Sequence, residues 1–125
     1  MADPIFVVQE HHASTHHWDF RLEHHGVLRS WAVPKGIPPD SEQDRLAIPT
    51  DDHALEFAEF EGTIPEGEYG AGSLSVWDIG TYRKLKWTTD EIVVVLAGRR
   101  LQGAFSLFQI KGGNWLIHRM RPTQC

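Results

Sequence analysis

The chain has 125 residues, enough for one domain with a buried core that needs no disulfide or metal staple. Its hydrophobic content of 41% and charged content of 23% exclude a disordered or fibrous protein. The longest apolar run, residues 92–97, is too short to cross a bilayer, and the N-terminal residues lack the pattern of a secretory leader. The single cysteine, Cys125, cannot form an internal disulfide, so we predict a cytoplasmic protein.

The net charge of −5 argues against nucleic-acid binding, but the charges are unevenly distributed along the sequence. Residues 40–68 contain ten acids and one base, whereas residues 83–121 contain eight bases and two acids. A local basic face that binds phosphates therefore stays open as an interpretation. The simpler alternative is that both segments are solvated faces.

Residues 5–9 and 18–23 are predicted strands, because β-branched, aromatic and alternating apolar residues fill them. A histidine-rich loop is expected between the two strands. Side chains two residues apart share a face of a strand, so His17, Asp19 and Arg21 are expected to point the same way. The aromatic and apolar residues between them then point into a core.

This polar strand face suits a metal ion that holds an anion. Two imidazoles and one carboxylate bind a divalent transition metal and leave positions open for water or substrate. His11, six residues before His17, is available as the second imidazole, whereas His12 and His16 are interpreted as spectators. Arg21 adds a planar fork that fits phosphate or carboxylate oxygens. The alternative is a group of solvated loop histidines beside a half-buried strand.

The rest of the chain gives mostly β signals. The expected elements are a turn at 24–26, a strand at 27–33, a proline-rich connection to 44, a strand at 45–48, a loop at 49–53, a helical turn at 55–58 capped by Asp or Thr, and a glycine-rich loop at 61–72. Short strands are expected at 73–78, 81–87, 91–97, 103–110 and 114–120. We therefore predict an all-β fold, a small closed or nearly closed antiparallel β-barrel of about eight strands with little helix.

His53 follows two carboxylates, Asp51 and Asp52. Neighbouring negative charges are expected to raise the pKa of this histidine and to favour the imidazolium. A histidine beside acids is common on protein surfaces, so this feature alone says little about function.

Three long motifs resemble a known family. They are VVQEHHASTHHWDFRLEHHGVLRSWAVPKGIP at 7–38, RLAIPTDDHALEFAEFEGTIPEGEYGAGSLSVWDIGTY at 45–82 and LQGAFSLFQIKGGNWLIHRM at 101–120. Together they strongly resemble the phosphoesterase domain of bacterial and archaeal DNA ligase D, over residues 6–120. The resemblance implies a single 3′-phosphoesterase domain over residues 1–125, here free-standing, with a small β-barrel fold.

The resemblance also implies an activity. Family members are manganese-dependent enzymes that trim a 3′-terminal ribonucleotide from a DNA primer end and then remove the 3′-phosphate that is left. The resulting 3′-OH serves non-homologous end joining. For this chain the implied cofactor is Mn²⁺, with Co²⁺ or Zn²⁺ as alternatives. The implied partners are primer-template 3′ ends, a separate DNA ligase or polymerase, and Ku, with no membrane.

Carried over by motif, the implied metal ligands are His11, His17 and Asp19. The residues implied to bind the scissile phosphate and to act in catalysis are Arg21, His53 and Arg45, and Lys35 is implied to have a supporting role. One position departs from the family. The family pattern DHPLDY is DHALEF at 52–57, so Phe57 replaces the tyrosine whose hydroxyl contacts the phosphate, which is expected to weaken the phosphomonoesterase step.

Two other classes of function fit parts of the pattern. A small Fe(II) oxygenase would combine His17 and Asp19 with a distal histidine, His53 or His118, in a facial triad, although 125 residues leave little room for a co-substrate. A non-catalytic module that binds DNA ends would use a structural zinc with four protein ligands and no open position.

Overall fold

The computed structural model describes residues 3–121, and Cys125, with the prediction made from it, lies outside that part. The described strands are β1 (Ile5–His12), β2 (His16–His24), β3 (Val27–Val33), β4 (Asp44–His53), β5 (Gly62–Ile64), β6 (Gly72–Trp87), β7 (Glu91–Ala97), β8 (Gln102–Gln109) and β9 (Trp115–Arg119). Two 3-10 turns, η1 (Leu55–Glu59) and η2 (Lys111–Gly113), are the helical segments of residues 3–121. None of the described helices is long and apolar enough to cross a membrane.

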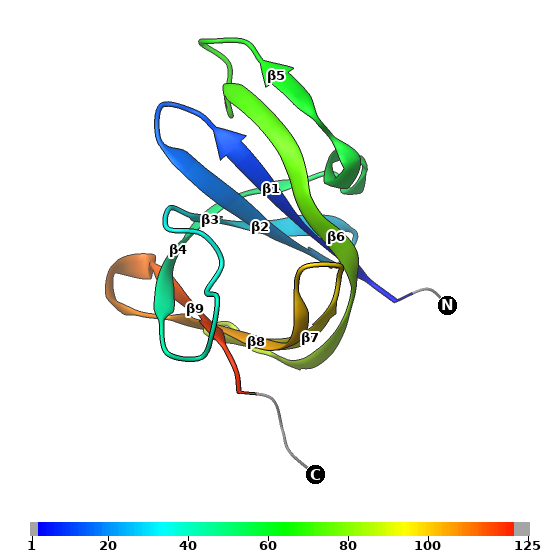
Figure 1. Ribbon diagram of the computed structural model, residues 1–125, viewed down its shortest axis with the longest axis vertical. Helices are drawn as coiled ribbons and strands as arrows, with labels where there is room; N and C mark the ends of the chain where they lie inside the picture. The colour runs from blue at the N-terminus through cyan, green and yellow to red at the C-terminus, as the bar shows by residue number, and fades with distance from the viewer. Residues whose placement is uncertain (1–2, 122–125) are drawn as a thin grey trace.

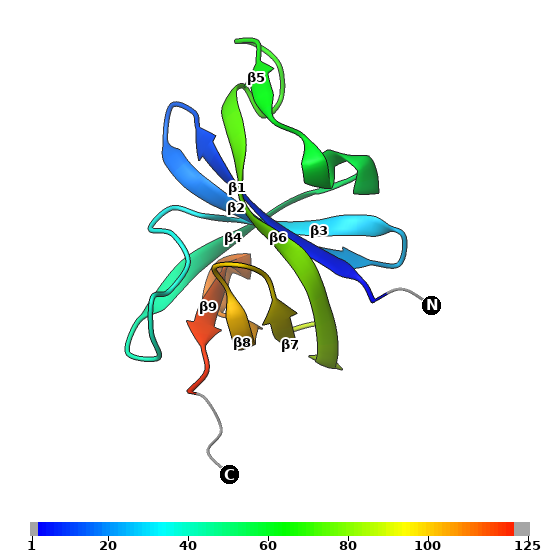
Figure 2. The same ribbon diagram turned by 45° about the vertical axis from the view of Figure 1, so that its right-hand side comes forward.

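The strands form one closed antiparallel barrel (Figure 1, Figure 2). Neighbouring strands follow the order β1-β2-β3-β4-β9-β8-β7-β6, and a further pairing of β1 with β6 closes the ring of eight. The short strand β5 adds to β6 outside this ring. The predicted all-β barrel of about eight strands with little helix is confirmed.

The barrel is filled by one large apolar cluster. Its largest fully buried members include Phe6, Phe20, Trp31, Phe105 and Ile117. A second, smaller cluster of Val7, Leu28 and Ala58 lies under η1. Neighbouring residues of a strand point to opposite faces. In β1, Phe6 and Val8 are buried in the barrel interior, and Val7 is buried on the outer face against Ala58 of η1. Part of the outer surface of the barrel is therefore roofed over.

The β1–β2 hairpin carries its histidines on the strands and not in a loop. His11 lies opposite His17, and His12 lies opposite His16, so the turn is limited to residues 13–15. The predicted histidine-rich loop was therefore too long. The predicted alternation in β2 is confirmed, because its apolar side chains lie in the barrel core and its charged ones are buried on the other face.

Two predicted interruptions do not occur. Residues 49–53, predicted as a loop, continue β4, with Pro49 opposite Trp31 and His53 opposite Leu28 after a bulge. Residues 73–87 form one strand, because Gly80 does not turn the chain but lets two backbones approach: a Cβ there would lie 2.2 Å from the carbonyl oxygen of Ala97.

The helical turn predicted at 55–58 is present as η1, but its expected Asp or Thr cap is absent. Ala54 occupies the N-cap position, without a side-chain hydrogen bond. The chain then passes through β5 and returns at β6, and this excursion lies beside the outer end of the β1–β2 hairpin (Figure 1, Figure 2). Residues 54–71 thus form the roof over the outer face of β1 and β2.

The turn that leads from β7 to β8 is organised by a buried carboxylate. Asp78 Oδ1 accepts hydrogen bonds from the backbone N–H groups of residues 79 and 99, and Oδ2 from those of residues 100 and 101, at 2.8–3.1 Å. Gly98 fits because a Cβ there would lie 2.3 Å from Asp78 Oδ2 and 2.6 Å from Phe6 Cζ. This contact ties β6 to the turn that leads from its neighbour β7 to β8.

Candidate metal and anion site

A cavity of about 340 Å³ lies between the outer face of the barrel and the roof segment. Its strand-borne lining residues are His11, His17, Asp19, Arg21, Thr50 and His53. Residues 13–14 and 69–71 complete the wall. The structure therefore brings five of the predicted site residues into one cavity, on strands that the barrel holds rigidly.

The three predicted metal ligands converge on one point. His11 Nδ1 lies 3.0 Å from His17 Nε2 and 3.2 Å from Asp19 Oδ2, and His17 Nε2 lies 3.2 Å from Asp19 Oδ1. The pairing of His11 with His17, and of Gln9 with Asp19, across the β1–β2 ladder produces this convergence. His11 and Asp19 are buried, so the donor set is largely shielded from solvent.

Backbone carbonyls fix the orientation of both imidazoles. His11 Nε2 donates to the carbonyl oxygen of Ala71 at 3.0 Å, and His17 Nδ1 donates to that of Thr15 at 2.8 Å. In the neutral tautomers that make these bonds, the other ring nitrogens carry lone pairs. Two nitrogen lone pairs and a carboxylate then face one point, which is favourable only around a positive charge. The residues therefore fit a divalent metal ion.

The pKa shifts of His17 and Asp19 both show that this point of the site attracts positive charge. The hydrogen bond with Asp19 raises the pKa of His17. Burial alone would raise the pKa of Asp19, but its hydrogen bond with His17 and the charge of Arg21 outweigh burial and lower that pKa. Asp19 therefore stays ionised and available to a cation.

Arg21 is buried beside this triad and held from several sides. Its Nε donates to Gln9 Oε1 at 2.6 Å, Nη1 to Ser30 Oγ at 2.9 Å, and Nη2 lies 3.4 Å from Asp19 Oδ2. The guanidinium also lies over the ring of Phe57, 5.0 Å from its centroid. A fixed, buried guanidinium at a cavity wall is suited to binding an anion.

Sequence analysis missed Gln9, which is fully buried. Its Nε2 donates to the carbonyl oxygens of Phe57 and Phe60, at 2.8 and 3.1 Å, so one amide links Arg21 to the roof segment. A signal was present in the sequence, because Gln9 lies two residues before His11 and shares its strand face.

His53 contradicts the prediction made for its charge. Burial and the nearby charge of Arg21 lower its pKa, so the expected rise caused by the neighbouring acids was wrong. Its Nδ1 lies 3.1 Å from Arg21 Nη1 and 2.9 Å from the carbonyl oxygen of Asp51. A neutral ring cannot accept from Arg21 and donate to Asp51 through the same atom at once. Burial and Arg21 favour the neutral ring, whose Nδ1 either accepts from Arg21 or donates to the carbonyl oxygen of Asp51.

Thr50, in the cavity wall, was also missed. Its Oγ1 is buried and has no hydrogen-bond partner within residues 3–121. An unsatisfied buried hydroxyl is costly, so a partner supplied by a ligand or by water is expected there.

The remaining predicted residues lie apart from the cavity wall. Arg45 donates to the carbonyl oxygens of Lys35 and Gly36 and to Gln43 Oε1, in and beside the loop between β3 and β4. Lys35 is exposed. Phe57 lies behind the site, with its ring 4.7 Å from that of His53. The roles of Arg45 and Lys35 stay predictions.

The fold and the site define a small β-barrel protein with a candidate metal centre next to a buried arginine that is suited to binding an anion. The family model for the DNA ligase D 3′-phosphoesterase domain matches residues 9–109. The chain belongs to this family.

Several curated relatives support this assignment. The chain is 52% identical over 120 residues to the multifunctional non-homologous end joining DNA repair protein LigD of Mycobacterium tuberculosis, a match that covers 93% of the chain and 16% of the relative. It is 46% identical to LigD of Mycolicibacterium smegmatis and 44% identical to LigD of Pseudomonas aeruginosa, over 95% of the chain and 17% and 15% of the relatives. The chain thus spans about a sixth of the length of these relatives.

Proposed function

We propose that this protein is a metal-dependent phosphoesterase that processes DNA 3′ ends. It removes a 3′-terminal ribonucleotide from a primer strand and then the 3′-phosphate that remains, so that a ligase receives a 3′-OH. Manganese is the proposed metal, with cobalt and zinc as alternatives. Primer-template ends are the proposed substrates, and a separate ligase or polymerase and Ku are the proposed partners.

The observation that carries this proposal is the position of Arg21. Its guanidinium lies between the His11-His17-Asp19 triad and His53 in one cavity wall. A phosphate in that cavity would meet a cation centre on one side and a planar donor fork on the other. Phosphoryl transfer depends mainly on such positioning and charge stabilisation.

Each side chain of the site has a separate role in the proposed reaction. His11, His17 and Asp19 would hold the metal, which supplies charge neutralisation of a phosphate oxygen and a more acidic bound water. Arg21 would hold a further oxygen, and the unsatisfied hydroxyl of Thr50 would donate to the substrate. Lys35, on the loop between β3 and β4, and Arg45, on β4 beside that loop, would act on a longer stretch of the nucleic acid.

His53 would give a proton to the leaving 3′-oxygen. In the free chain its pKa is lowered by burial and by Arg21, so it must gain this proton when substrate binds. A bound phosphate opposes the charge of Arg21, and this change favours the imidazolium.

The number of donors disfavours a structural zinc, and the positions of His53 and His118 disfavour the oxygenase triad considered from the sequence. A structural zinc would need a fourth protein ligand, and the group that converges here among the described residues has three members. The oxygenase triad considered from the sequence would place His53 or His118 at the metal together with His17 and Asp19. His53 instead contacts Arg21, and His118 pairs with Asp44 at 2.7 Å.

The test is an assay with a 5′-labelled primer-template that carries one 3′-ribonucleotide. We expect shortened products with Mn²⁺ and none with a chelator. Asp19→Ala should abolish both manganese binding and shortening, whereas Asp44→Ala, which removes a carboxylate that also pairs with a histidine, should retain both. Circular dichroism establishes that each variant is folded. Equal activity of wild type and Asp19→Ala would refute the proposed site.

A further inference from the structure

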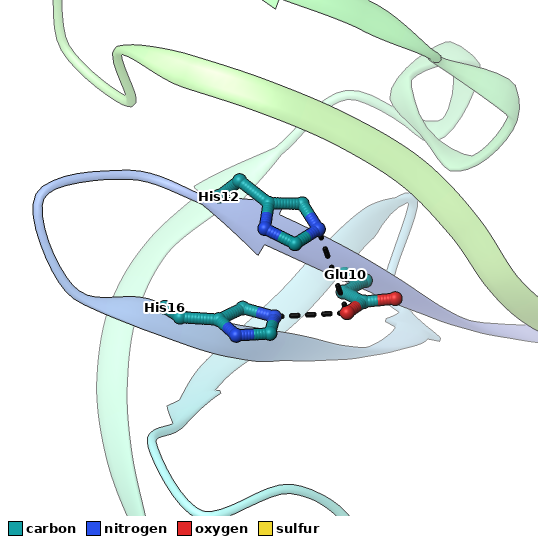
Figure 3. A group of neighbouring side chains, drawn as sticks. All are labelled: Glu10, His12 and His16. Carbon is teal, nitrogen blue, oxygen red and sulfur yellow. Dashed lines mark hydrogen bonds and ion pairs between the residues drawn. The ribbon is translucent and has the colours of Figure 1, made fainter.

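A second group of metal-ligand side chains lies on the other face of the β1–β2 hairpin. Figure 3 shows Glu10 and His12 on β1 and His16 on β2, with both imidazoles directed at the carboxylate. Their donor atoms all lie within 4.8 Å of one another. Sequence analysis interpreted these two histidines as spectators, and the function proposed above uses none of the three residues.

The distances suit a shared metal ion. His16 Nε2 lies 2.8 Å and His12 Nε2 lies 3.5 Å from the same atom, Glu10 Oε2. Two ligands that are each about 2.0–2.1 Å from a tetrahedral zinc lie about 3.3 Å from each other. Small rotations of the side chains therefore suffice to place one cation between these three atoms.

The strand register holds the three residues together. His12 and His16 are directly opposite in the ladder, and Glu10 lies two residues before His12 on the same face. The two imidazoles stack with centroids 4.3 Å apart, and His16 also contacts the ring of Trp18 at 4.5 Å. Trp18 in turn packs against the barrel core. The group is therefore positioned by its neighbours, although its side chains can be reached from solvent.

The group is separate from the site in the cavity. Neighbouring residues of a strand point to opposite faces, so His12 and His16 point away from His11 and His17. The side chains of His12 and His16 are 57% and 44% exposed, whereas that of His11 is 8% exposed. A metal can reach the outer group without entering the cavity.

We propose that Glu10, His12 and His16 form a second binding site for a divalent transition metal of the zinc class. Two imidazoles and one carboxylate favour zinc, cobalt or nickel over magnesium or calcium, which prefer oxygen ligands. Three protein ligands leave at least one position for water. A metal bound there ties β1 to β2 at the residues that adjoin His11 and His17, and so it stiffens the hairpin that carries the inner triad.

The experiment uses protein without a histidine tag and Zn²⁺ alone as the probe. Calorimetric titration counts the zinc ions bound by wild type, by His12→Ala/His16→Ala, by Asp19→Ala and by His118→Ala. The last variant is the matched control, because His118 also pairs with one carboxylate, Asp44, but has no second histidine there in the described structure. We expect His12→Ala/His16→Ala to lose one equivalent of zinc, and His118→Ala to lose none.

A second readout does not depend on variants. In wild-type protein, zinc should shift the ring ¹⁵N signals of His12 and His16 but not that of His118. The inference is overturned if His12→Ala/His16→Ala binds as much zinc as wild type, or if His118→Ala loses as much. Because zinc at the outer site should persist in Asp19→Ala, this result is independent of whether the proposed phosphoesterase activity is found.

Discussion

Gln9 Oε1 accepts a hydrogen bond from Arg21 Nε at 2.6 Å, and both side chains are buried. The amide nitrogen of the same glutamine donates to two carbonyl oxygens of the roof segment. One side chain therefore sets both the direction of the guanidinium and the position of the roof above it.

Gln9→Met should destabilise the protein and weaken catalysis together. The substitution keeps a similar volume but leaves Arg21 Nε and two carbonyl oxygens without their partner. Each such loss costs about 1–3 kcal/mol, so the three losses together should lower the free energy of unfolding by at least about 3 kcal/mol in urea titrations. Gln109→Met, at an exposed position on β8, is the control and should change it little. A small loss of stability with full activity would contradict the role given to Gln9.

The pH dependence of activity should differ between kcat/KM, which reports on His53 in the free protein, and kcat, which reports on His53 in the substrate complex. Burial and Arg21 lower its pKa below the ordinary 6.5 in the free chain. If the protonated ring acts as the acid, kcat/KM must fall as the pH rises through this lowered value. The phosphate raises the pKa in the complex, so the corresponding fall in kcat should occur at a higher pH.

Steady-state profiles between pH 5 and pH 9, roughly the range in which histidine titrates in proteins, provide the measurement. His53→Asn should remove this pH dependence from both parameters. If kcat and kcat/KM fall at the same pH, and if His53→Asn leaves both profiles unchanged, the titration belongs to another group.

Phe57→Tyr should speed removal of the 3′-phosphate more than removal of the ribonucleotide. A terminal phosphate carries nearly two negative charges near neutral pH, so its binding requires more stabilisation by hydrogen-bond donors than that of a diester. One donor to an anionic transition state is worth roughly 2–4 kcal/mol, or about a hundredfold in rate. The ring at position 57 lies next to both Arg21 and His53, so an added hydroxyl would extend the same donor group.

Single-turnover assays that follow both steps test this prediction, and 3′-phosphate ends should accumulate with the wild type. Phe60→Tyr is the control. The ring of Phe60 stacks on that of Phe57, with centroids 5.0 Å apart, but among the described contacts the guanidinium of Arg21 lies over the ring of Phe57 and not over that of Phe60. If the wild type removes the phosphate as fast as it forms, Tyr69 in the cavity wall is the first residue to examine as a replacement donor.

Much of the site could be predicted from local pattern. The alternation around Asp19 gave the correct strand face, and the spacing of His11 and His17 suits a hairpin with a short turn. Long-range relations were harder to predict. Gly80 resembles a turn residue in sequence but marks a close approach of two backbones, and Pro49 lies within a strand. The charge of His53 was predicted from its neighbours in sequence, whereas its pKa depends on burial and on Arg21, 32 residues away.

Asp78→Ala should destabilise the barrel strongly, because this carboxylate is buried, although it lies outside the cavity. It would leave four backbone N–H groups, at residues 79 and 99–101, without their acceptor. We expect a loss of about 3–5 kcal/mol in the free energy of unfolding by urea titration, as for a broken buried network. Asp90→Ala, in an exposed turn, is the control. Equal stability of the two variants would show that water replaces the carboxylate.

The closure of the barrel by β1 and β6 also bears on the order of events during synthesis. His11, His17 and Asp19 come from one hairpin, which can form within about 1–10 μs. Closure joins Ile5 to Thr81, so it must wait until most of the chain has left the ribosome, and such distant pairings fold slowly. We therefore expect the nascent hairpin to bind the proposed metal before the cavity around it exists. Manganese present from the start of refolding should then speed the recovery of native tryptophan fluorescence, and metal added after refolding would find its ligands already enclosed.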